Sequence, residues 1–254
     1  MNLSIALDPV WQSVLLFAVG LFSGVVNAIA GGGTFFSFPV FVALGLPPVM
    51  ANATNAAAVL PSHPMAAWAE RRYLWARPDF WRLVGLALLG GGLGALLLSS
   101  VGNQGFEQLV PYLLLIATLL FACGSRLRVW LQRTAEFKLG LLSSLLLLLI
   151  CAYGGFFAAG MGVILMAGLL LLGLQQMTDN NAVKNLLGGL VNAVAVMVWS
   201  LQGLIDWSLV WQCFAGAIVG GMCGAKLARH LPVLWLRRMV IGVGLGLSGV
   251  YFLT

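Results

Sequence analysis

The stretch that decides the fold runs from Ala30 to Asn55 and reads AGGGTFFSFPVFVALGLPPVMANATN. It contains a glycine cluster, a double proline and two asparagines, although the segments on either side of it are almost entirely apolar. Inside a lipid bilayer, broken backbone and polar side chains are costly unless they are buried in protein or line a cavity. We therefore interpret this stretch as half of a transport site in a membrane protein.

The composition of the 254-residue chain supports a membrane protein, because 61% of the residues are hydrophobic and only 8% are charged. A soluble domain carries about 25% charged residues. Several apolar runs have the length of about 20 residues that a helix needs to cross a bilayer. The predicted fold is an all-α polytopic membrane protein with about eight to ten transmembrane segments, some of them broken or re-entrant.

The net charge of +6 reflects membrane topology. Twelve of the 13 basic residues lie within residues 71–82, 126–138 and 226–238, each between apolar segments. The positive-inside rule places such clusters in short cytoplasmic loops. The connections around residues 102–107 and 202–206 contain acidic residues and no basic ones, so we expect them on the outer side. A nucleic-acid partner is excluded by this distribution.

The two halves of the chain follow one pattern when the sequence is shifted by 130 positions, without a gap. The shift aligns a tryptophan, an asparagine and a glycine triplet in one register. The aligned pairs are Gly24 with Gly154, Gly32 with Gly162, Leu44 with Leu174, Asn55 with Asn185, Trp81 with Trp211, and Gly90, Gly91 and Gly94 with Gly220, Gly221 and Gly224. We predict two repeats, residues 1–133 and 134–254, within one membrane domain.

The charges orient these repeats in opposite directions. The segment that ends at Trp68 runs into a basic loop, whereas its counterpart ends at Leu201, before the acidic connection. Equivalent elements that point opposite ways form an inverted-topology repeat, which is common in alternating-access carriers. Both termini are then on the outer side. Both termini can lie on the same side only if each short apolar segment, at about residues 35–44 and 163–173, pairs with the following helix as a re-entrant or fully spanning hairpin.

The glycine clusters Gly31, Gly32 and Gly33, followed by Thr34, and Gly160-Met161-Gly162 lie where long and short segments meet. Glycine lets the backbone break and approach a substrate, with free N–H groups at the next helix start. We expect both clusters to contact substrate. Close packing of helices in lipid is the alternative explanation.

Asn52 and Asn55 in the first half, and Lys184 and Asn185 in the second, predict an anion site. A helix that starts near them would direct its positive N-terminal end and the side-chain amides at a central ligand. Lys184 is the only basic residue outside the three clusters, and an isolated ammonium in apolar helix is a functional hypothesis by default. The alternative is a solvated loop in which Lys184 pairs with Asp179 or snorkels to the membrane surface.

Ser62 and Asn192 occupy equivalent positions one to two turns further along the same segments and can line the same cavity. His63 can carry a proton for coupling, because its ordinary pKa is near neutral. A hydrogen-bonded packing histidine between Pro61 and Pro64 is the alternative.

The sequence contains no set of residues for catalysis. It has no nucleophile with a neighbouring base and no P-loop, and the four cysteines have no metal-ligand spacing. We expect a protein that is not an enzyme, with no catalytic residues, no metal and no cofactor.

The chain resembles the TauE/SafE family of sulfite exporters and related permeases over nearly its whole length. The residues that carry the resemblance are Gly24, Ala30-Gly31-Gly32-Gly33, Pro39, residues 51–55, residues 154–162 and Lys184-Asn185. The resemblance implies an inner-membrane secondary transporter of sulfur-containing anions such as sulfite, sulfoacetate and other organosulfonates. The second half departs from a full glycine triplet, because Met161 separates Gly160 from Gly162.

Together, these observations predict a secondary-active anion carrier in the bacterial inner membrane that works by alternating access, with export as the expected direction. Its partners would be a small anionic substrate and the lipid bilayer, and a homodimer stays open. The alternatives are a structural or assembly membrane protein without transport, a channel, and a transporter of a different small anion.

Overall fold

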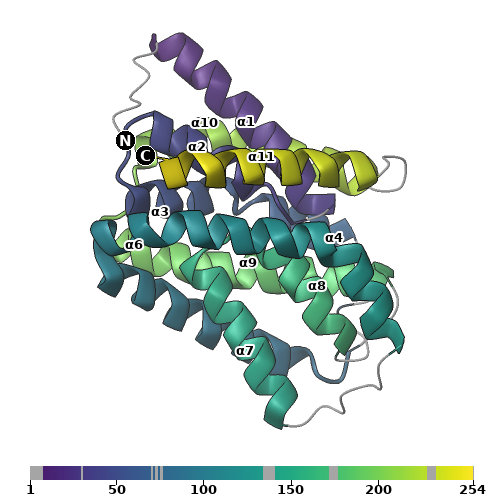
Figure 1. Ribbon diagram of the computed structural model, residues 1–254. Helices are drawn as coiled ribbons and strands as arrows, with labels where there is room; N and C mark the ends of the chain where they lie inside the picture. Colours follow the sequence, from purple (N-terminus) through teal and green to yellow (C-terminus); the bar gives the residue numbers. More distant parts are fainter. Residues whose placement is uncertain are drawn as a thin grey trace.

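The computed structural model describes residues 8–29, 31–69, 71, 74, 77–133, 141–171, 177–227 and 233–253, and it is helical throughout these ranges apart from short turns. The helices are α1 (Pro9–Ile29), α2 (Thr34–Ala43), α3 (Pro48–Val59), α4 (Ser62–Ala69), α6 (Phe80–Arg133), α7 (Leu141–Phe156), α8 (Met161–Leu171), α9 (Met177–Leu201), α10 (Trp207–Leu227) and α11 (Val233–Leu253). Figure 1 shows their arrangement. The all-α prediction is confirmed.

Four stretches of the described chain are long and apolar enough to cross a membrane: Pro9–Ile29, Phe80–Cys123, Asn180–Leu201 and Trp207–Gly224. The second, of 44 residues, would be about 66 Å long as one straight helix, twice the thickness of a bilayer core. It is divided at Gly102, whose φ of 69° and ψ of 179° interrupt the helix. The predicted polytopic membrane protein is thereby confirmed.

The outer surface of α6 is apolar, as a lipid-facing surface must be. Leu89, Leu93 and Leu97 follow one another at four-residue intervals, and each is more than half exposed. Such a continuous exposed apolar face would be unusual on a soluble monomer, but it suits a helix whose neighbour is lipid.

The two short segments predicted at residues 35–44 and 163–173 are α2 and α8, which contain 10 and 11 residues. At 1.5 Å per residue each helix is about 15 Å long, half the thickness of the hydrocarbon core. Over the residues that the structure describes, neither helix is long enough to cross the membrane alone. The chain turns after α2 at Gly45, where φ is 92°, and α3 then begins at Pro48.

Two helices, α3 and α9, begin earlier in the chain than the sequence predicts. The predicted segment 52–68 is divided into α3 and α4 around Pro61, and α3 begins earlier, at Pro48, because proline is well suited to the first helical position. The helix start expected near Lys184 and Asn185 is wrong, because α9 already begins at Met177. Asn180 Nδ2 donates to the Met166 carbonyl of α8 at 3.1 Å, which ties this polar first turn to its neighbour.

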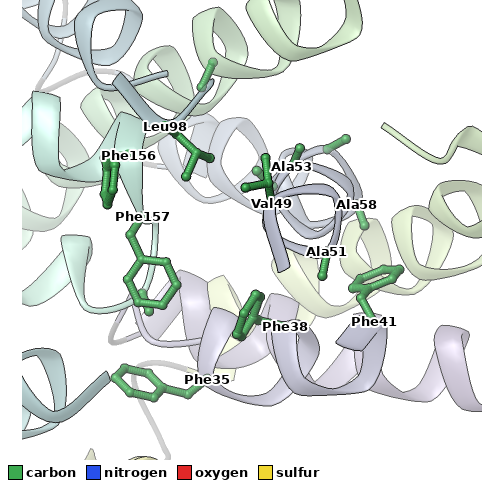
Figure 2. Packing of buried hydrophobic residues seen from close by; sticks show 14 of the residues in the cluster. Phe35, Phe38, Phe41, Val49, Ala51, Ala53, Ala58, Leu98, Phe156 and Phe157 are labelled. Atoms are coloured by element: carbon green, nitrogen blue, oxygen red, sulfur yellow. The ribbon is translucent and has the colours of Figure 1, made fainter. Parts of the chain in front are cut away.

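Aromatic packing holds the short helix α2 in place. Phe35, Phe38 and Phe41, at three-residue spacing, are fully buried. Phe41 lies beside α3 and Phe38 faces Phe157, just after α7 (Figure 2), whereas the Phe35 ring meets the Phe121 ring of α6 at 5.8 Å. The Phe38 ring meets the Phe157 ring edge to face at 5.8 Å. Burying each phenylalanine contributes about 2–3 kcal/mol, so this half-length helix is firmly positioned by its side chains.

The glycine runs within the long helices are packing faces. Gly220 of α10 faces the backbone of Leu21 in α1 so closely that a Cβ there would overlap the Leu21 carbonyl. In the same way a Cβ on Gly90 of α6 would lie 2.6 Å from the Leu148 carbonyl oxygen of α7. Each pair joins one helix from residues 1–133 with one from residues 134–254, so the two sequence halves are interleaved in space.

Candidate anion-binding site

The two predicted breaks meet at the centre of the molecule. Gly31, with φ of 78°, and Gly162 touch backbone to backbone, because a Cβ built on either one would lie 2.5 Å from the Cα of the other. Only glycine permits this approach together with the positive φ at Gly31. The structure therefore brings together two glycine clusters that are 131 residues apart in the sequence.

The other cluster glycines also lie against protein. A Cβ on Gly32 would be 2.6 Å from the Phe121 ring, and one on Gly160, where φ is 76°, would be 2.7 Å from the Ala117 Cβ. Met161, between the glycines of the second cluster, is buried. Close packing accounts for these glycines in the structure, and their contact with substrate stays a prediction.

Two N–H groups of the first cluster, those of Gly31 and Gly33, have protein acceptors. The N–H of Gly33, which precedes the buried Thr34 at the start of α2, donates to Asn27 Oδ1 at 2.9 Å. This N–H was predicted to be available for a ligand, and the structure uses it to fix the turn between α1 and α2.

Lys184 lies inside α9 with 1% of its surface exposed. Its Nζ donates to the Asn27 carbonyl oxygen of α1 at 3.4 Å. The alternative of a solvated or snorkelling lysine is wrong, because α9 extends back to Met177 and carries this residue into the interior. The side chain of Asp179 lies outside the described residues, so pairing between the two stays untested.

Asn27 is a buried polar residue that the sequence reasoning missed. Besides accepting the Gly33 N–H, its Nδ2 donates to Ser62 Oγ of α4 at 3.4 Å. Ser62 Oγ in turn donates to the Val59 carbonyl at 2.6 Å. The signal was present in the sequence: an asparagine two residues before the end of an apolar membrane helix is as costly as the polar residues that were singled out.

His63 brings α4 against α9. A Cβ on Gly188 would lie 3.0 Å from atoms of the His63 ring, so the imidazole packs directly on this glycine. Lys184 precedes Gly188 by four residues and lies on the same side of α9. We call Asn27, Ser62, His63 and Lys184 the central polar cluster.

Three asparagines near this cluster in the chain are fully buried with no hydrogen bond to either atom of the side-chain amide. They are Asn55 of α3, and Asn185 and Asn192 of α9. Asn185 and Asn192 are seven residues apart, so they lie on one side of α9, with Gly188 between them. An unpaired buried amide costs about 1–3 kcal/mol, so these three groups are the natural donors for a bound polar ligand.

Asn52 and Thr54 differ from these asparagines, because they bond to the protein. Asn52 Nδ2 donates to the Phe156 carbonyl at 3.2 Å, which ties α3 to the end of α7. Thr54 Oγ1 accepts the N–H of Asp206 at 3.0 Å and so fixes the start of α10. The threonine is therefore a helix-anchoring residue in this structure.

The prediction that helices start at the asparagines is wrong. Asn52 is the fifth residue of α3 and Asn185 the ninth residue of α9, because these helices begin at Pro48 and Met177. Their backbone N–H groups therefore lie within helices rather than at the free N-terminal ends. Their side-chain amides, rather than the positive ends of helix dipoles, remain as candidate donors to a ligand.

Among the residues that the structure describes, no group of three or more His, Cys, Asp or Glu side chains could hold a metal ion. The candidate site consists of amides, one hydroxyl, one imidazole and one ammonium. These groups bind anions by hydrogen bonding and charge.

Known proteins with similar sequences are membrane transporters. Residues 16–252 match the family model described as Sulfite exporter TauE/SafE. A probable membrane transporter protein of Haemophilus influenzae is 31% identical over 234 residues, covering 89% of this chain and 89% of that protein. The probable membrane transporter protein YfcA of Escherichia coli K12 is 24% identical over 237 residues, covering 92% and 87%. No solved structure matches the chain. Because the family match covers most of its length, the protein belongs to the TauE/SafE sulfite exporter family.

Proposed function

We propose that this protein is a secondary-active carrier that exports sulfur-containing anions, such as sulfite, sulfoacetate or other organosulfonates, across the bacterial inner membrane. The observation that carries the proposal is the set of three buried, unpaired amides, Asn55, Asn185 and Asn192. Two of them flank the side of α9 that holds a buried lysine. Buried polar groups in folded proteins normally have a hydrogen-bond partner, and a bound polar ligand would supply one for these amides.

The chemistry of the site suits a tetrahedral or pyramidal oxyanion. The amide NH₂ groups of Asn55 and Asn185 donate hydrogen bonds with direction, and the Lys184 ammonium supplies positive charge. Hydrogen bonds to a charged partner are about twice as strong as neutral ones, which favours an anion over a neutral solute. In this proposal, Asn192 and Ser62 line the same site.

The remaining predicted residues would form the surroundings of the bound anion. Gly31–Thr34 and Gly160–Gly162 would form its backbone floor, and Asn52 would lie at its edge. His63, which packs on Gly188 one helical turn from Lys184, is the proposed group for proton coupling. A proton that arrives there would change the charge beside the anion, which is how a histidine can couple the two fluxes.

Alternating access would use the predicted inverted repeats, and recurring contacts support them. Gly220 packs on Leu21, and the positions 130 residues away from these, Gly90 and Cys151, are also in contact. A second pair behaves in nearly the same way. Gly221 approaches the Ser62 backbone, and its equivalent in the first half, Gly91, approaches the backbone of Val191, which is one residue before the equivalent of Ser62, Asn192.

The same contacts suggest which helices would move together. The backbones of α1 and α10 are in close glycine-mediated contact, as are those of α6 and α7. Such close contacts resist sliding, because any added atom would clash. We propose that α1 with α10 and α6 with α7 act as two rigid bodies that rock about the contact between Gly31 and Gly162.

The proposed orientation, with both termini outside, is supported by contacts at the two ends of the molecule. Arg82, in the first basic cluster, donates to Ser144, which follows the second basic cluster. At the other end, Ser99 Oγ donates to Gln202 of the acidic connection at 2.5 Å. The start of α6 and the start of α7, which adjoin the basic clusters, are therefore in contact with each other. The acidic connection at residues 202–206 instead lies beside Ser99, further along α6.

Counterflow in proteoliposomes tests the proposal. Vesicles that contain the wild-type protein and are loaded with unlabelled sulfite or sulfoacetate should accumulate labelled anion, whereas equivalent carboxylates should be poorer substrates. Asn55→Ala and Asn185→Ala should raise KM by about tenfold, the value of one charge-assisted hydrogen bond. Asn103→Ala is the matched control, because Asn103 bonds to the Val49 N–H at the outer end of α3.

The outcomes separate the alternatives. A wild-type protein that moves none of these anions would overturn the proposal in favour of a structural or assembly role. Linear flux without saturation or counterflow would indicate a channel. Unchanged kinetics in both asparagine variants would refute the proposed site while leaving transport intact.

A further inference from the structure

Three elements converge on Asn27, and each does so through a different polar atom or group. The side-chain oxygen accepts the N–H of Gly33 in the turn before α2, at 2.9 Å. The side-chain nitrogen donates to Ser62 Oγ at the start of α4, at 3.4 Å. The backbone carbonyl accepts Lys184 Nζ of α9, also at 3.4 Å. One residue therefore connects both broken segments of the first half with the buried cation of the second.

The carbonyl that receives Lys184 also stabilises the chain break. Its oxygen accepts the N–H of Gly31 at 3.1 Å, which closes the left-handed turn where Gly31 touches Gly162. This carbonyl lies in the last turn of α1, where the helix dipole places partial negative charge. In the structure, the negative end of α1 therefore interacts with Lys184 at the point where the two repeats meet.

We propose that Asn27 is a positioning residue of the anion site, which holds the Lys184 ammonium and ties its position to the break after α1. The inference rests on the proposed function. When an anion binds, it takes over part of the interaction that Lys184 makes with the Asn27 carbonyl. Because that same carbonyl closes the turn at Gly31, binding changes the hydrogen bonding at the contact between the two repeats. Occupancy of the site and the geometry of the break are thereby coupled.

Two substitutions at one position distinguish this role from simple packing. Asn27→Ala keeps the carbonyl that receives Lys184 but removes the side-chain bonds to Gly33 and Ser62 that fix the end of α1. The carbonyl, and with it the Lys184 ammonium, is then held less firmly, so KM should rise about tenfold with a smaller change in kcat. Asn27→Asp keeps the acceptor for the Gly33 N–H but adds a negative charge on the residue that receives Lys184. That carboxylate competes with the substrate for the ammonium, so KM should rise further than in the alanine variant.

A purely structural role predicts the opposite order, because the aspartate retains a bond that the alanine loses. The assay is saturable counterflow of sulfite and sulfoacetate in proteoliposomes. It is supported by the anion-dependent rise in melting temperature of the full chain in detergent, which reports binding without transport. Asn103→Ala, which also removes an amide-to-backbone bond, should leave KM unchanged.

A wild-type KM in both Asn27 variants, or a weaker effect of aspartate than of alanine, would overturn the inference. If neither variant folds, Asn27→Ser decides, because the shorter side chain gives up the bond to Ser62 Oγ without adding a charge: a raised KM supports the inference and an unchanged KM overturns it. Failure of the proposed function looks different, since the wild-type protein would then show neither counterflow nor anion-dependent stabilisation. Loss of activity in Lys184→Met with normal Asn27 variants would overturn this inference alone.

Discussion

Replacing Lys184 by methionine should remove most of the anion affinity. The Lys184 side chain is buried, with 1% of its surface exposed, and its Nζ donates to the Asn27 carbonyl oxygen at 3.4 Å. An anion held at about 4 Å from this charge, at an effective dielectric constant of about 20, gains about 4 kcal/mol. That energy corresponds to roughly a thousandfold in affinity. Methionine fills a similar volume without a charge, so it isolates the electrostatic contribution.

The fold should survive this change. Burying a charge is costly, and the apolar methionine carries no such cost. The Asn27 carbonyl also keeps the N–H of Gly31 as a donor. We therefore expect the melting temperature of the Lys184→Met protein without anion to be no lower than that of the wild type. Its increase on addition of sulfite or sulfoacetate should disappear.

The assay is counterflow in proteoliposomes together with thermal unfolding in detergent at several anion concentrations. Lys226→Met is the matched control, because Lys226 is an exposed lysine in the last turn of α10 and its loss removes the same formal charge. Wild-type KM and wild-type thermal stabilisation in Lys184→Met would refute the electrostatic reasoning. An equal loss in Lys226→Met would show that net charge, rather than the buried site, controls affinity.

Three further predictions use other contacts. Asn55→Ala and Asn185→Ala should weaken anion binding without lowering the melting temperature, because no hydrogen bond to the side chain is lost; a clear destabilisation would show that the amides are paired. Gly162→Ala should destabilise the protein by about 1–3 kcal/mol in thermal unfolding, whereas Gly246→Ala, which meets nothing within 4 Å, should not; equal effects would contradict the close contact. Thr54→Val should lower stability by about 1 kcal/mol with unchanged KM, and a raised KM would instead place this hydroxyl on the substrate.

Much of the fold followed from patterns that act along the chain. Apolar run lengths indicated the membrane helices, and the short segments appeared as α2 and α8 close to their predicted bounds. These features depend on local composition and period, which a bilayer constrains strongly.

Helix starts were predicted less well, because capping depends on neighbours. A helix start was expected near Lys184 and Asn185, but residues 177–181 already form the first turn of α9, fixed where Asn180 bonds to α8. For the same reason the helix start expected near Asn185 was wrong, since Asn185 lies well inside α9. A polar segment beside another helix can complete its hydrogen bonds there, and sequence does not show which helix that will be.

The sequence by itself determined that this is a polytopic membrane protein, that its glycine breaks recur 130 residues apart and that Lys184 is unusual. Only the tertiary structure brought Gly31 against Gly162, buried Lys184 against the carbonyl of Asn27, and separated bonded Asn52 from unpaired Asn55. The physical reason is that run lengths and periods are properties of one segment. The partner of a buried polar group is set by which helices cross and at what depth, and this depends on the packing of the whole chain.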